Sequence, residues 1–319
     1  MKIQCIVGID IGGTNCRIGL TDREYNLYHP EICYTAELQA DGDFLERLES
    51  FTSSYIELYQ SDYDIMAISL GFPSTIDKDR KVVLSTPNIA GLNNVPIVTI
   101  FENVFHLPIY INRDVNMLMY HDLNYFHIPK DTLALGFYMG TGFGNAIYIN
   151  NEILLGKNGV AGELGHIPML GKKRKCACGN EACIESVAGG RYLEELCNVR
   201  FPGTPISEIY VKHRNDPEVI EQIEYMAIPI ATEINIFDPD YIILGGGIIQ
   251  MEDFPMKRLE EYILKHTRKP YPAQGLKILY ALSEQENGII GAGIYGFHRL
   301  DQTSSKVLTG AQSITSDCQ

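Results

Sequence analysis

Continuous apolar stretches occur in two groups along the chain and predict buried β-strands. The first group comprises residues 3–11, 16–20, 65–70 and 109–111, and the second comprises residues 133–139, 146–149 and 241–244. In each group the first two stretches flank a short Gly-rich turn. We interpret this repeat of strand, turn and strand as a duplication of architecture, not of sequence.

Apolar residues at helical spacing predict helices at 43–60, 93–105, 115–126, 217–237 and 288–300. Strands that alternate with helices indicate an α/β protein. The 319 residues allow two domains. We expect an N-terminal α/β domain at 1–116 and a C-terminal one at 117–300, with the final helix packing back on the first. Glycines in that helix predict close backbone packing, and residues 301–319 predict a mobile polar tail.

Composition excludes several classes of protein. The net charge of -14 argues against non-specific binding to nucleic acid. The first ten residues do not form a signal peptide, and no apolar stretch is long enough to span a membrane. Five of the eight cysteines are scattered, as is typical of reduced thiols in a cytoplasm. We therefore expect a cytoplasmic protein that binds neither nucleic acid nor membranes.

Gly-rich turns are the first candidate for chemistry. Asp10-Ile-Gly-Gly-Thr-Asn15 and Gly140-Thr-Gly-Phe-Gly144 each join two predicted strands. Glycines let main-chain N–H groups approach a phosphate, and the Asp10 carboxylate could hold Mg²⁺ beside it. An ordinary hairpin turn explains the first motif equally well, but two turns in matching positions favour a phosphate clamp. Because a strand follows the glycines, the motif is not a dinucleotide fingerprint.

Asp114 follows a predicted strand and precedes a predicted helix. One interpretation is a base that accepts a proton from a hydroxyl attacking a phosphate. The other is an N-cap of the following helix, which the spacing alone slightly favours.

His166, Cys176, Cys178 and Cys183 form the strongest signal in the sequence. One imidazole and three thiolates suit a tetrahedral Zn²⁺, and four protein ligands predict a structural zinc site. Glu163 and Glu185 flank this segment; they are either surface charges or groups that bind hydroxyls. The second ring nitrogen of His166 could bind another group while the first binds the metal.

Five segments together resemble the ROK family (repressor, open reading frame, kinase). They are Asp10-Ile-Gly-Gly-Thr, Gly140-Thr-Gly-Phe-Gly, Glu163-Leu-Gly-His166, Cys176-Ala-Cys-Gly-Asn-Glu-Ala-Cys-Ile-Glu185 and Asp238-Pro-Asp-Tyr-Ile-Ile-Leu-Gly-Gly-Gly247. The resemblance runs from Asp10 to about Gly296. It implies an actin-like, ribonuclease H-type ATPase fold, with two α/β domains around a cleft and a zinc-bound loop at 163–185.

The resemblance also implies roles for individual residues. The phosphates of ATP would contact Gly12, Gly13, Thr14, Gly140, Thr141 and Gly142, and the adenosine would lie near Gly246 and Gly247. Asp10 would help to place Mg²⁺, and Asp114 would be the catalytic base, which replaces the cap interpretation. Sugar hydroxyls would be bound by Asn88, Glu163, His166 and Glu185.

Some positions depart from the family pattern. Arg113 stands where family members usually have an Asn that contacts the sugar, so it would change how a hydroxyl is recognised. Leu92 replaces a usual Trp, and Ala182 and Asn145 each replace a usual Gly. The segments 71–73, 85–88, 113–116 and 160–168 resemble those of family members that act on D-allose.

The resemblance therefore implies ATP-dependent phosphorylation of the C6 hydroxyl of a hexose, with D-allose as the first candidate. Glucose, fructose and N-acetylmannosamine are alternatives, and a non-catalytic sugar sensor is a further one. Repressors of the family carry a DNA-binding domain before the first Gly-rich motif, whereas nine residues precede Asp10 here, so we do not expect a repressor. Members of the family are often homodimers, so we expect one here.

Overall fold

The computed structural model describes residues 2–40, 43–86 and 89–316, with side chains up to residue 303. The chain forms two compact units. The first contains Met1–Phe126, Gly156–Val160 and Gln285–Gln319, and the second contains His127–Leu155 and Ala161–Glu284. The first unit thus extends beyond residue 116, because the helix at Asp114–Tyr125 packs within it. Asn88 lies outside the described residues.

The first unit contains a five-stranded sheet of order β3-β2-β1-β4-β7. Its strands are β1 (Ile3–Ile11), β2 (Asn15–Asp22), β3 (Leu27–Tyr34), β4 (Tyr63–Phe72) and β7 (Ile109–Arg113). β1 and β2 form a hairpin, whereas β4 and β7 run parallel to β1. The sequence pattern missed β3, because this edge strand is largely exposed and has no apolar alternation.

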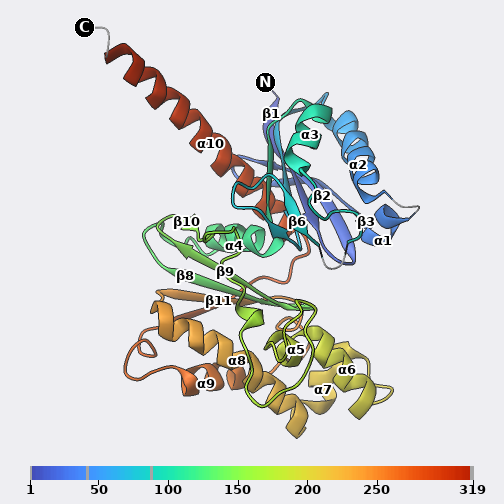
Figure 1. Ribbon diagram of the computed structural model, residues 1–319, viewed down its shortest axis with the longest axis vertical. Helices are drawn as coiled ribbons and strands as arrows, with labels where there is room; N and C mark the ends of the chain where they lie inside the picture. Colours follow the sequence, from blue (N-terminus) through green and yellow to red (C-terminus); the bar gives the residue numbers. More distant parts are fainter. Residues whose placement is uncertain (1, 41–42, 87–88, 317–319) are drawn as a thin grey trace. The chain divides into compact units, whose positions relative to one another are not determined.

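Helices cover both faces of this sheet (Figure 1). The helices of the unit are α1 (Thr35–Gln39), α2 (Phe44–Tyr59), α3 (Ile97–Phe105), α4 (Asp114–Tyr125) and α10 (Asn287–Ser316), and a short hairpin is formed by β5 (Thr75–Ile76) and β6 (Val83–Ser85). α2 and α3 pack on one face, and α10 packs on the other. α3 begins at Ile97 instead of residue 93, because Val95 forms a β-bridge with Val83.

The final helix, α10 (red in Figure 1), is longer than the sequence predicts and continues past Leu300 to Ser316. Extending an existing helix adds one hydrogen bond for each residue fixed and needs no new nucleation, which explains how polar residues can continue it. The predicted close packing of its glycines is confirmed. A Cβ atom at Gly291 would lie 1.9 Å from the carbonyl oxygen of Met117 in α4.

The second unit repeats the same sheet topology with different strands. Its order is β10-β9-β8-β11-β12, formed by β8 (Ala134–Met139), β9 (Phe143–Ile149), β10 (Glu152–Ile153), β11 (Tyr241–Gly245) and β12 (Lys277–Tyr280). β8 and β9 form a hairpin, and β11 and β12 run parallel to β8. The predicted duplication of architecture is therefore confirmed.

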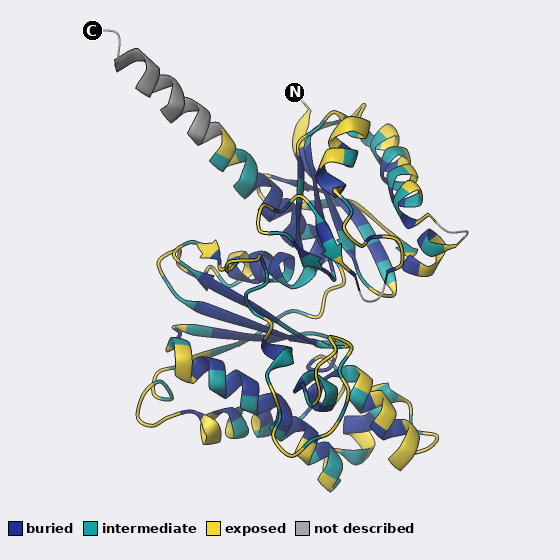
Figure 2. Cartoon of the chain, viewed as in Figure 1, coloured by how far each residue is buried: buried dark blue, intermediate teal, exposed yellow. Residues whose placement is uncertain are grey.

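The core of the second unit lies between this sheet and its helices, and the central strands are buried along most of their length (Figure 2). The helices are α5 (Glu185–Ala188), α6 (Gly190–Arg200), α7 (Ile209–His213), α8 (Pro217–Phe237) and α9 (Met256–His266), with 3₁₀ turns at Leu164–His166 and Ile206–Glu208. α8 has the bounds that the sequence predicts.

A substitution tests the close packing of α10. Gly291→Ala should lower the melting temperature, because a methyl group cannot fit against the backbone of α4. Helix propensity alone would give the opposite result, since Ala is favoured over Gly by about 1 kcal/mol. Gly13→Ala is the control for thermal unfolding, because a Cβ atom there meets nothing within 4 Å. An unchanged or raised melting temperature of Gly291→Ala would contradict the packing.

Candidate functional site

The first Gly-rich turn connects β1 to β2 in the first unit. The N–H group of Gly12 donates to the carbonyl oxygen of Asn15 at 2.8 Å, and Thr35 holds the turn through bonds to the carbonyls of Gly12 and Thr14. Gly13 and Thr14 are exposed, and their N–H groups donate to no other residue that the structure describes. The turn therefore presents free main-chain donors, as a phosphate site requires.

Two carboxyl groups, Asp10 and Asp114, lie close to this turn. Burial raises the pKa of Asp10, while Arg17, whose Nη1 lies 3.5 Å from Asp10 Oδ2, opposes the rise. Burial, and after it the neighbouring Asp10 carboxylate, raise the pKa of Asp114 to about 7. Asp114 is therefore a carboxyl group that can accept or release a proton near neutral pH.

Asp114 is the first residue of α4, and the N-cap position belongs to Arg113. The cap interpretation of Asp114 is therefore wrong in position, although its Oδ1 accepts a hydrogen bond from the N–H of Val115 at 2.8 Å. Arg113 is itself buried, with 9% of its surface exposed. The adjacent Asn112 is fixed by bonds to the main chain of Arg113 and the side chain of Asn116.

The second Gly-rich turn connects β8 to β9 in the second unit. The N–H groups of Thr141 and Gly142 donate to no residue that the structure describes, as at the first turn. The turn formed by Gly245-Gly246-Gly247 packs against the start of this second Gly-rich turn. The N–H group of Ile248 donates to the carbonyl oxygen of Met139 at 2.9 Å. Gly246 has a φ of +93°, and a Cβ atom there would lie 2.5 Å from the same oxygen. Gly is required at this position.

His166, Cys176, Cys178 and Cys183 meet in one cluster of the second unit, with their ligand atoms within 4.8 Å of one another. Cys176 Sγ lies 3.6 Å from His166 Nδ1, and Cys178 Sγ lies 3.6 Å from Cys183 Sγ. Zinc–sulfur bonds of about 2.3 Å in a tetrahedron would place two sulfurs about 3.8 Å apart. None of these cysteines is in a disulfide. The four residues fit a tetrahedral metal ion.

The two glutamates beside the cluster have different contacts. Glu163 Oε2 lies 3.4 Å from His166 Nε2. The imidazole of His166 therefore contacts the cluster through Nδ1 and the Glu163 carboxylate through Nε2. Glu185 Oε2 accepts a hydrogen bond of 2.9 Å from the N–H of Phe143, in the second Gly-rich turn. Glu185 Oε1 forms no hydrogen bond within the described part of the chain, and it is open to a ligand.

Two departures from the family pattern have structural consequences. Ala182 has a φ of +57°, a left-handed conformation that costs a residue with a Cβ about 1–2 kcal/mol, which explains why Gly is usual there. Asn145 is fully buried and donates to Glu233 Oε2 at 2.7 Å. Burial raises the pKa of Glu233 to about 7. The sequence pattern does not single out Glu233, because this residue lies in the helical pattern of α8 with no neighbouring motif.

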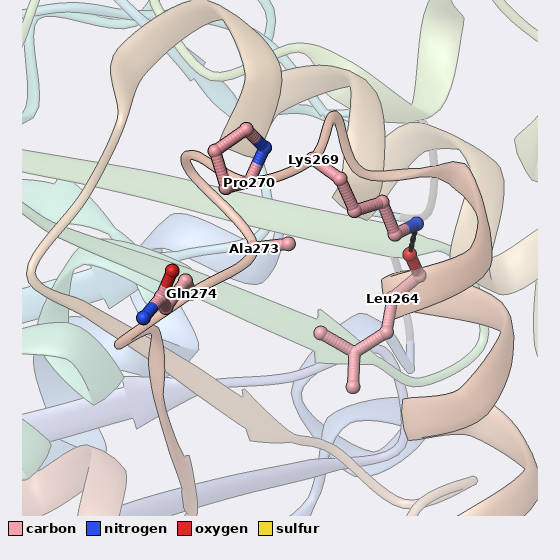
Figure 3. A pocket seen from close by; sticks show the side chains of 5 residues that line it. All are labelled: Leu264, Lys269, Pro270, Ala273 and Gln274. Carbon is pink, nitrogen blue, oxygen red and sulfur yellow. Dashed lines mark hydrogen bonds between the residues drawn. The ribbon is translucent and has the colours of Figure 1, made fainter.

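A surface pocket of the second unit lies apart from these groups. It is lined by Leu264, Lys269, Pro270, Ala273 and Gln274 (Figure 3). Lys269 Nζ donates to carbonyl oxygens at the end of α9, including that of Thr267 at 2.8 Å. The charged group of this pocket is thus engaged by the backbone, and the pocket contains no predicted site residue.

The predicted site residues thus fall into two sets. In the first unit, the fold brings together Asp10, Gly12, Gly13, Thr14, Arg113 and Asp114. In the second unit, it brings together Gly140, Thr141, Gly142, Gly246, Glu185 and the Cys/His cluster with Glu163.

Comparison with known proteins identifies the class. The model of the ROK family matches residues 6–295, so the chain belongs to the ROK family. It is 25% identical over 306 residues to the N-acetyl-D-glucosamine kinase of Vibrio cholerae, covering 89% of this chain and 97% of that one. It is 26% identical over 283 residues to the xylose repressor of Caldicellulosiruptor bescii, covering 82% of this chain and 70% of that one.

A solved structure supports the same assignment. The ROK hexokinase of Thermus thermophilus superposes with a TM-score of 0.78 at 26% identity, over 93% of this chain and 99% of that chain. The predicted fold class, an actin-like ATPase fold with two α/β units, is therefore confirmed. Among the described residues, no helix has the length and apolar character to cross a bilayer.

The raised pKa of Asp114 predicts a pH-dependent loss of stability. Above about pH 4 an unfolded Asp is ionised, whereas folded Asp114 stays protonated up to about pH 7, so stability falls across this window and stays lower above it. Asp114→Asn removes this penalty. We expect its melting temperature at pH 8 to exceed that of the wild type by roughly 2–5 °C, with little difference at pH 4.

The control for this measurement is Asp79→Asn, which changes an exposed carboxylate in the same unit. Equal melting temperatures of the wild type and Asp114→Asn at pH 8 would contradict a buried Asp114 with a raised pKa.

The Cys/His cluster predicts a bound metal. We expect about one zinc ion per chain, measured by mass spectrometry of the purified protein, and its loss in Cys178→Ser, because one thiolate ligand is removed. Cys33→Ser, outside the cluster, should keep its zinc. If Cys178→Ser retained a full complement of zinc, the cluster would not be the site.

Proposed function

We propose that the protein transfers the γ-phosphoryl group of ATP to the C6 hydroxyl of a hexose, and that D-allose is its preferred substrate. The observation that carries the proposal is Asp114, a carboxyl group with a pKa near 7 beside a Gly-rich turn with free N–H donors. Family membership and kinases among its relatives support the reaction class.

Asp114 acts as the base. Its carboxylate accepts the proton of the sugar hydroxyl as that oxygen attacks the γ-phosphorus of ATP; the bond from this phosphorus to the bridging oxygen breaks, and ADP leaves. A pKa near 7 keeps a large fraction of Asp114 ionised at neutral pH while leaving it basic enough to take the proton. We therefore expect activity to rise with pH through about 7.

The two Gly-rich turns hold the phosphates. Gly13 and Thr14 in one turn, and Thr141 and Gly142 in the other, supply main-chain N–H groups that no other described residue occupies. Such fixed donors stabilise charge on the transferred group without reorganisation. Mg²⁺, when bound, neutralises phosphate charge, and Asp10 is the carboxylate suited to hold it. Gly246 and Gly247 belong to the adenosine side.

The sugar is bound by Asn88, Arg113, Glu163, His166 and Glu185. Glu163 and the free Oε1 of Glu185 are suited to accept hydrogen bonds from hydroxyls. His166 is held between the cluster and Glu163. Zinc, when bound by the cluster, does no chemistry; it fixes the loop that carries these side chains.

Arg113 is the reason for proposing D-allose as the preferred sugar. Allose differs from glucose in the orientation of the C3 hydroxyl, and Arg113 occupies the position of a usual sugar-contacting Asn in the family. A guanidinium donates hydrogen bonds and accepts none, so it requires a hydroxyl placed to accept. The segment Arg113-Asp-Val-Asn116 supports the same choice, because it resembles the corresponding segment of family members that act on D-allose.

The experiment is a coupled assay of ADP release with allose, glucose, mannose, fructose and their N-acetylamino relatives. We expect the highest kcat/KM with allose, and a loss of kcat of about 10²-fold or more in Asp114→Ala with little change in sugar affinity. A preference for another hexose would reject allose and keep the kinase.

The xylose repressor among the relatives defines the alternative outcome. If a sugar bound but none of the tested sugars caused release of ADP, the kinase would be rejected and a sugar sensor indicated. Near wild-type turnover by Asp114→Ala would reject Asp114 as the base.

A further inference from the structure

We propose that Glu185 is a positioning residue for the phosphate-binding turn at Gly140–Gly144, and that the Cys/His cluster fixes Glu185. The cluster then supports nucleotide binding as well as sugar binding. This inference rests on the proposed function, because it assigns that turn to the phosphates of ATP.

The contact between Glu185 and the turn is close. Glu185 Oε2 accepts the N–H of Phe143 at 2.9 Å, and a Cβ atom at Gly142 would lie 2.4 Å from the same oxygen. Gly142 thus has no room for a side chain, because the carboxylate fills that space. A hydrogen bond to an ionised acceptor is roughly twice as strong as a neutral one.

The residues that follow Glu185 hold the other side of the turn. The N–H of Gly190 donates to the carbonyl of Gly140 at 2.9 Å, and the N–H of Arg191 donates to the carbonyl of Thr141 at 3.2 Å. A Cβ atom at Gly190 would lie 2.6 Å from the carbonyl oxygen of Gly140. The segment 185–191 therefore holds both limbs of the turn.

The same segment is tied to the cluster. Cys183 precedes Glu185 by two residues, and its Sγ lies 3.6 Å from that of Cys178. Ser186 donates to the carbonyl of Cys183 from its N–H at 3.0 Å and from its hydroxyl at 2.7 Å. A displacement of Cys183 therefore moves the start of α5, and Glu185 with it.

One consequence concerns which donors face the nucleotide. The N–H of Phe143 is occupied by Glu185, so it is not a phosphate ligand. No described residue accepts a hydrogen bond from the N–H groups of Thr141 and Gly142, so these two donors of the turn can face the phosphates. Glu185 therefore acts on the nucleotide through the shape of the turn, while its Oε1 is left for the sugar.

Two variants of Glu185 test its role in positioning the turn. Nucleotide affinity is measured by calorimetry with a non-hydrolysable ATP analogue and Mg²⁺, without sugar. We expect Glu185→Ala to weaken this affinity by about tenfold, because the charged hydrogen bond to the turn is lost. Glu185→Gln should stay within about threefold of the wild type, because its amide oxygen can accept the same N–H.

Two controls keep the result specific. Glu181→Gln removes an exposed carboxylate from the same loop and should leave nucleotide affinity unchanged. Glu163→Ala removes the carboxylate beside His166 Nε2, and we expect it to weaken sugar affinity alone. Thermal unfolding of each variant shows whether it is folded. Wild-type nucleotide affinity in folded Glu185→Ala would overturn the positioning role.

The link to the cluster has its own measurement. In Cys178→Ser, we expect faster amide hydrogen exchange across residues 140–144 and a nucleotide affinity reduced as in Glu185→Ala. This variant avoids chelators, which would also remove Mg²⁺. Unchanged exchange at the turn in a variant that has lost its metal would overturn the link. If the wild type bound no nucleotide, the proposed function itself would fail. Equal nucleotide binding by the wild type and a variant would instead reject only the positioning role.

Discussion

The parallel register of β1, β4 and β7 is the constraint on which the first half of the site depends. Asp10 pairs with Gly71, and Gly71 pairs in turn with Asn112, so these strands end at one edge of the sheet. Asp114 follows β7 directly and therefore lies beside Asp10. Since the carboxyl ends of parallel strands share an edge, the fold itself brings the two carboxyl groups together.

This register has an electrostatic cost. Two carboxyl groups share a poorly solvated edge, so one of them, Asp114, stays protonated up to about pH 7. Burial also raises the pKa of Asp10, and Arg17, opposite it across the hairpin, opposes that rise. The same arrangement supplies a carboxyl group with a pKa near 7, which is the property that the proposed base requires.

The sequence predicts the parts of the site that local pattern encodes. Each strand, each Gly-rich turn and the set of four cluster residues occupies its own short stretch of the chain. Spacing and residue type are therefore sufficient to find them. The contacts that the pattern misses join distant segments. Glu185 is separated from Phe143 by 42 residues, and Glu233 is separated from Asn145 by 88. Neither pair has a spacing rule, because each is set by how helices pack on the sheet.

The cost of Ala182 shows how local conformation and the site are related. Its left-handed backbone lies next to Cys183, within the segment that leads to Glu185. A loop that keeps this conformation without Gly must be held by contacts elsewhere, and the bridges at Pro168–Cys183 and Lys175–Glu181 supply some of them. A metal ion bound by the cluster would add a further constraint at the same place. The loop is therefore restrained close to where it passes into α5, the helix that begins with Glu185.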